Sequence, residues 1–88
     1  MAIKNVYFVE ITDTFGGEAN YSWVTRHKVT ASNERGAMRK IGREAGMHWR
    51  CMGNYGNMQR WDSVSGLTCA FVSQWDDDAH GAYRVNTI

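Results

Sequence analysis

The chain has 88 residues, of which 43% are hydrophobic, and its 10 basic and 9 acidic side chains give a formal net charge of +1. This length predicts one domain over residues 1–88 and excludes two lobes around a deep cleft. The near-neutral charge argues against a general nucleic-acid coat and against an acidic DNA mimic. The longest apolar runs are far shorter than the roughly 18 residues of a membrane span, so we expect no membrane contact.

The first predicted elements form a β-hairpin. Residues 4–12 have the alternating, largely apolar pattern of a central strand, and residues 21–30 alternate again. Residues 13–20 lie between them and contain the pair Gly16-Gly17, which favours a hairpin loop. The sequence therefore predicts two antiparallel strands joined by this loop.

A helix is predicted next. Ser32 or Asn33 is suited to the N-cap, and Gly46 to the position that ends the helix. An apolar stripe at helical spacing comprises Ala37, Met38, Ile41 and Ala45. Gly36 and Gly42 lie inside the predicted helix, where each costs about 1 kcal/mol relative to alanine. Close packing of the helix on a sheet would explain why they are present.

The second half of the chain is predicted to be mainly extended. Residues 47–52 and 67–75 have strand patterns, and residues 58–61 predict a shorter strand between two turn-rich segments. Residues 79–88 fit either an additional edge strand or a frayed end. The predicted fold class is α+β: a small antiparallel sheet of four to five strands, in a ββαββ-like order, with one helix packed on one face.

The predicted partner-binding residues carry charge or a large aromatic ring. Arg35, Arg39 and Arg43 recur every four residues with Lys40 beside them, which places a positive stripe on one helix face. Trp61 is a candidate interface anchor, and Asp76-Asp77-Asp78 is a candidate acidic rim. The alternative interpretation is a solvated helix face, a core tryptophan and a solvated strand end.

Two other kinds of site were weighed against simpler interpretations. The tryptophans and nearby arginines would suit base stacking, but most of the aromatic residues are expected in the core. His48 and Cys51, with Cys69 and His80 downstream, are poorly spaced for zinc, so the cysteines are expected to be structural. No catalytic constellation is recognisable, and we expect no enzyme activity, no metal and no cofactor.

A resemblance suggests a class of function. Residues 7–21, Tyr-Phe-Val-Glu-Ile-Thr-Asp-Thr-Phe-Gly-Gly-Glu-Ala-Asn-Tyr, together with residues 43–46 and 75–77, resemble small uncharacterised bacteriophage proteins. In size and in the order of its elements the chain is also similar to small phage anti-CRISPR proteins. The resemblance implies a phage or mobile-element protein that binds and inhibits a bacterial defence complex in the host cytoplasm.

The expected partner is thus a host protein or ribonucleoprotein complex, and a homodimer is compatible with the sequence. One alternative is a small nucleic-acid-binding domain that uses the sheet aromatics and the arginine stripe. A further alternative is a domain that sequesters a nucleotide. The short N-terminal segment Met1–Asn5 has no apolar leader, and two cysteines fit a reducing compartment, so we expect a cytoplasmic location.

Overall fold

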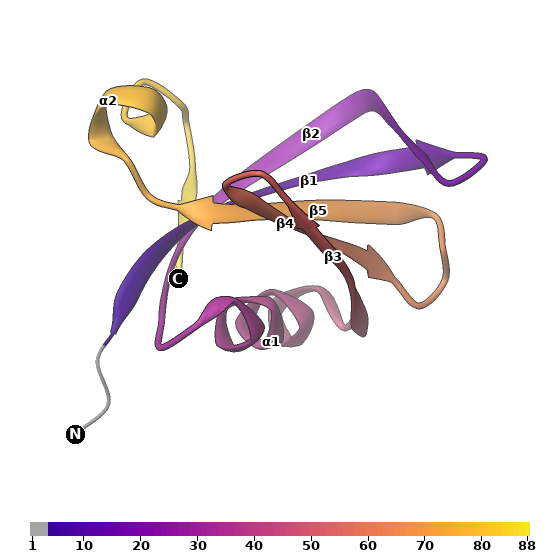
Figure 1. The fold of residues 1–88 in the computed structure, drawn as a ribbon, viewed down its shortest axis with the longest axis horizontal. Helices are drawn as coiled ribbons and strands as arrows, with labels where there is room; N and C mark the ends of the chain where they lie inside the picture. The colour runs from indigo at the N-terminus through magenta and orange to yellow at the C-terminus, as the bar shows by residue number, and fades with distance from the viewer. Residues whose placement is uncertain (1–3) are drawn as a thin grey trace.

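The computed structural model describes residues 4–88, which form one six-stranded sheet and two helices (Figure 1). In chain order the elements are β1 (Asn5–Phe15), β2 (Glu18–Ala31), α1 (Glu34–Ala45), β3 (Trp49–Tyr55), β4 (Met58–Ser63), β5 (Thr68–Gln74), α2 (Asp77–His80) and β6 (Asn86–Thr87). The strand order across the sheet is β3-β4-β5-β1-β2-β6. The first three residues, part of the segment expected to carry no leader, lie outside the described residues. Within residues 4–88, no helix is long and apolar enough to cross a membrane.

The predicted fold class is wrong in the number of strands, in their directions and in the number of helices. The sheet has six strands and is mixed, because β6 runs parallel to β2 whereas the other neighbouring pairs are antiparallel. The backbone N–H of Ile88 donates to the Lys28 carbonyl at 2.9 Å, and the Thr30 N–H donates to the Ile88 carbonyl at 3.0 Å. Of the two alternatives expected for residues 79–88, the additional edge strand is present, at Asn86–Thr87, but its parallel pairing with β2 joins residues far apart in the chain and leaves no local pattern.

The predicted hairpin is present, but its strands are longer than expected. β1 and β2 continue into the segment predicted as a loop and leave only Gly16 and Gly17 as the turn. Both glycines have positive φ angles, 61° and 87°, which is the backbone that a two-residue hairpin turn requires and that glycine adopts without strain. The Gly-Gly pair thus determines the register of the strands next to the turn, and this register shifts between Thr12 and Thr14.

Helix α1 packs on one face of the sheet through three of the four residues of its predicted apolar stripe, whereas the fourth, Ala45, is exposed. The Asn33 side chain accepts a hydrogen bond from the Gly36 N–H at 2.7 Å, and Gly46 ends the helix with a φ of 66°. Ala37, Met38 and Ile41 are buried against Val9, Val29 and Val72 of the central strands, among other core residues. The opposite side of the helix therefore faces away from the sheet.

The other face of the sheet is partly covered by the C-terminal segment, which was not expected. Figure 1 shows α2 on the side of the sheet opposite to α1. The ring of Phe8 stacks on His80, with ring centroids 4.0 Å apart, and on Tyr83 at 5.6 Å. Phe8 is consequently only 7% exposed, although it does not face α1. This second aromatic cluster leaves less of that face exposed.

Candidate partner-binding site

A concave surface lies between α1 and the beginning of the β3–β4 pair. Its volume is about 530 Å³. Its rim consists of the charged Arg35, Arg39 and Arg43 together with His48, and its apolar floor includes Met38, Met47, Trp49 and Trp61. We call this feature the arginine groove. The helix supplies the arginines at its i, i+4 spacing, and the chain reversal after Gly46 brings His48 and Trp49 to the opposite wall.

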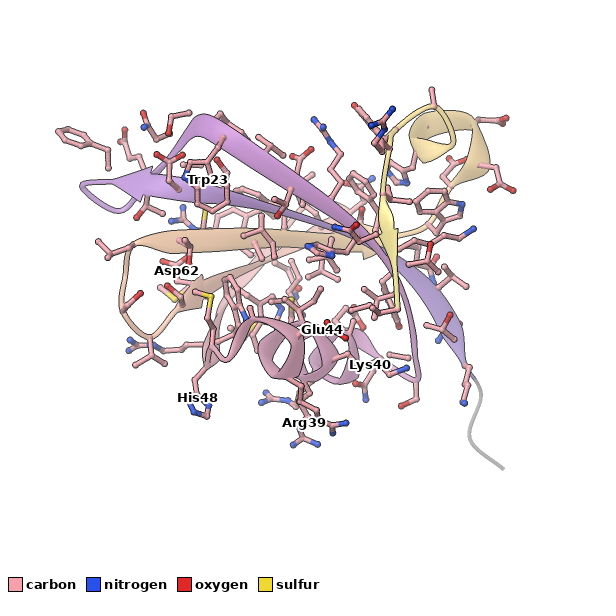
Figure 2. All side chains as sticks on the ribbon, turned by 180° about the vertical axis from the view of Figure 1, so that it is seen from behind. Trp23, Arg39, Lys40, Glu44, His48 and Asp62 are labelled. Carbon is pink, nitrogen blue, oxygen red and sulfur yellow. The ribbon has the colours of Figure 1, made fainter. Side chains whose placement is uncertain are left out.

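The positive charge of the arginine groove is not neutralised by carboxylates. No aspartate or glutamate lines the groove. The ion pairs among residues 4–88 are Arg26 with Glu10 and Arg60 with Asp62, and neither involves an arginine of the groove. Figure 2 shows Arg39 and His48 projecting on the same side of the molecule, away from the sheet. This arrangement is suited to binding an anionic group.

Trp61 lies in the arginine groove, but mostly beneath its surface. It is 4% exposed, and its indole N–H donates to the Gln59 side-chain oxygen at 2.6 Å. The guanidinium carbon of Arg35 lies 5.5 Å from the Trp61 ring centroid, within the range of a cation–π contact. Trp61 therefore supports Arg35 and forms part of the floor, and little of its ring remains free to contact a partner.

Lys40 is separated from the other basic residues of the predicted set. Its ammonium group donates a hydrogen bond to the Thr30 carbonyl oxygen at 2.5 Å. In Figure 2 its side chain lies on the side of the C-terminal strand, apart from Arg39. Lys40 thus helps to fix α1 to β2, where β6 also pairs.

The three aspartates lie at a different place in the fold. Asp76 caps α2 by accepting from the Asp78 N–H at 2.9 Å, and Asp77 accepts from the Trp75 indole N–H at 2.6 Å. All three line a second hollow of about 1010 Å³ that also includes Glu34 and Tyr7. Burial, together with the nearby Glu34 carboxylate, raises the pKa of Tyr7. The predicted set therefore divides into a basic groove, an acidic hollow and a structural lysine.

The cysteines and histidines do not form a common site. Cys51 pairs with Trp61 and Cys69 with Asp62, so the two thiols lie on opposite faces of the sheet, and both are free. Burial raises the pKa of Cys69, so a smaller fraction of this thiol is ionised at neutral pH. In the part of the chain that the structure describes, no three His, Cys, Asp or Glu side chains come close enough to hold a metal ion.

Sequence reasoning did not place Met47, His48 or Trp49 in a partner-binding site. All three follow directly after the glycine that ends α1. Their position could have indicated this, because the chain reverses direction at the glycine that ends a helix and the next residues run back beside that helix. Gly42 allows the backbone of Met47 to lie close to the helix, because a Cβ at position 42 would be only 2.5 Å from the Met47 carbonyl oxygen.

The two tryptophans of the groove are expected to respond differently to the same substitution. The indole N–H of Trp49 is buried without a hydrogen-bond partner, whereas that of Trp61 is bonded. Trp61→Phe should lower the free energy of unfolding by about 1–3 kcal/mol, because it removes a hydrogen-bonded group from the core. Trp49→Phe should lower it by less than about 1 kcal/mol, because the unpaired buried N–H of Trp49 already costs free energy in the native state. Urea denaturation of both variants measures the difference. Equal losses would contradict this account of Trp49.

Comparison of the chain with protein-family models, with curated proteins and with solved structures found no match.

Proposed function

We propose that this chain is a binding protein of phage or mobile-element origin that inhibits a bacterial defence or other host complex in the cytoplasm by occupying an acidic surface of one of its proteins. The proposal combines the resemblance noted in the sequence with the arginine groove. It requires no catalytic step, since binding at a surface that the host complex needs is sufficient to block it.

The observation that carries the proposal is the set of arginines on the exposed side of α1. Arg35, Arg39 and Arg43 are exposed, line one groove and have no carboxylate beside them in it. Like charges four residues apart on a helix repel one another and destabilise it slightly. A partner that supplies carboxylates would remove this repulsion, so the arrangement favours an acidic surface as its complement.

A protein partner fits the groove better than a nucleic acid. Stacking on bases requires open aromatic faces, but Trp61 is buried and its ring lies under Arg35. A polyanion also needs a long positive track, yet the acidic hollow begins at Glu34, next to the first arginine of the groove. The positive surface is therefore local, as expected for a contact between proteins.

The proposal is tested by capture from host lysate with and without nuclease. We expect a protein retained in stoichiometric amount after nuclease treatment by the wild-type chain. The triple variant Arg35→Glu/Arg39→Glu/Arg43→Glu should lose it, because each substitution places a carboxylate against an acidic surface. The control variant Lys4→Glu/Lys28→Glu/Arg84→Glu makes the same change in net charge at positions away from the groove and from β3, and it should retain the protein.

Two results would contradict the proposal. One is retention of nucleic acid alone that is lost at moderate salt, which would support a nucleic-acid-binding domain. The other is equal capture of the protein by both triple variants, which would show that net charge, and not the groove, determines retention.

A further inference from the structure

We propose that the arginine groove binds an extended acidic segment of the partner protein, with carboxylates against the arginines and one apolar side chain on the groove floor. This inference rests on the proposed function and specifies the chemistry and conformation of the bound segment.

The spacing of the arginines matches that of side chains along an extended chain. Residues four apart on a helix are separated by about 6 Å along its axis. Alternate side chains of an extended segment, which lie on one side of it, are about 6.6 Å apart. Acidic residues at alternate positions of such a segment would therefore meet Arg35, Arg39 and Arg43 in turn.

The floor of the groove indicates that charge is only part of the contact. Met38 and Trp61 are almost fully buried, so the part of the floor that a partner can reach belongs to the half-buried Met47 and Trp49. These two residues give the groove an apolar surface beneath its charged rim. An apolar side chain inserted there would be removed from water together with the floor, which a phosphate backbone cannot achieve.

The outer wall of the groove belongs to an edge strand. Among residues 4–88, β3 pairs with β4 alone. The Val64 N–H donates to the His48 carbonyl at 2.9 Å, so the backbone of His48 is hydrogen-bonded toward β4. In an antiparallel pair, hydrogen-bonded residues alternate with residues whose N–H and C=O point away from the partner strand. The N–H and C=O of Trp49 and Cys51 therefore point away from β4, toward the open edge. An irregularity between Cys51 and Gly53 limits this open edge to a short stretch. An extended segment beside Trp49 is thus placed to add main-chain hydrogen bonds over that stretch.

Direct titration with synthetic probes tests this inference. The peptide Glu-Asp-Glu-Leu-Glu-Asp-Glu is compared with the same peptide carrying alanine in place of leucine, and with an oligothymidylate of equal charge. Affinity is measured by calorimetry at low and at physiological salt. The indole N–H signals of Trp49 and Trp23 in ¹⁵N-resolved NMR spectra report where the probe binds, since Trp49 lines the groove and Trp23 does not.

We expect the leucine peptide to bind and to shift the Trp49 signal while the Trp23 signal stays in place. Binding should weaken by about tenfold or more in the Arg35→Glu/Arg39→Glu/Arg43→Glu variant and stay unchanged in the Lys4→Glu/Lys28→Glu/Arg84→Glu control. The alanine peptide should bind several times more weakly, because it leaves the floor uncovered.

Three outcomes would overturn the inference. They are binding of the oligothymidylate in preference to the peptide, equal binding of the peptide by both triple variants, and no peptide binding at all. If the peptide fails but lysate capture still yields a nuclease-resistant protein that depends on the groove arginines, the bound segment is different and the proposed function stands. If both fail, the proposed function is wrong as well.

Discussion

Replacement of Ile41 by alanine is expected to lower the free energy of unfolding by about 2–5 kcal/mol, the largest effect that we predict for a single substitution. Ile41 is 1% exposed and belongs to the core that joins α1 to the central strands. Truncation removes apolar contacts and leaves a cavity that the sheet beneath cannot collapse to fill. Because the helix also carries the groove arginines, the same variant should bind its partner less well.

Urea denaturation followed by far-ultraviolet circular dichroism measures this loss. The matched control is Val64→Ala, which also shortens an aliphatic side chain but at a position that is 60% exposed, and it should change the free energy by less than about 0.5 kcal/mol. If Ile41→Ala behaved like this control, α1 would not be packed on the sheet as described.

Gly42→Ala is expected to destabilise the protein by about 1–2 kcal/mol, although the same change inside an ordinary helix stabilises it by about 1 kcal/mol. A Cβ at this position would lie 2.5 Å from the Met47 carbonyl oxygen, which is backbone and cannot move alone. The Met47 N–H is itself bonded to the Gly42 carbonyl at 2.9 Å. Relief of the clash would therefore displace the segment that forms one wall of the arginine groove.

Gly36→Ala provides the comparison within the same helix. A Cβ there would lie 3.3 Å from the Asn33 side-chain oxygen and 3.4 Å from the Ala31 Cβ, and a side chain can shift by a few tenths of an ångström. We expect a smaller loss than for Gly42→Ala, measured by thermal and urea denaturation of both variants. A stabilised Gly42→Ala variant would show that the chain after α1 does not approach the helix this closely.

Local signals predicted the elements that local interactions determine. The Gly-Gly turn, the Asn33 cap, the Gly46 stop and the buried stripe through Met38 and Ile41 were all recognisable, and each depends on residues close in the chain. The exposed side of α1 followed from the same periodicity. This is why the three arginines were identified correctly as neighbours on one helix face.

The errors concern contacts between distant segments. The parallel pairing of β6 with β2 and the stacking of His80 on Phe8 join the two ends of the chain, and neither leaves a periodic pattern. Trp61 looked suitable as an interface anchor because sequence alone does not reveal which face of its strand α1 covers. The groove itself required the position of Trp49 relative to α1, which depends on the close approach at Gly42.

Arginine footprinting of the complex with the captured partner tests the central claim most directly. Phenylglyoxal modifies accessible guanidinium groups, and mass spectrometry then reports the reactivity of each arginine in the free and the bound chain. We predict that Arg35, Arg39 and Arg43 react in the free chain and are protected in the complex, whereas Arg84 reacts equally in both. Unchanged reactivity of the three groove arginines in a stoichiometric complex would contradict the account and place the interface elsewhere.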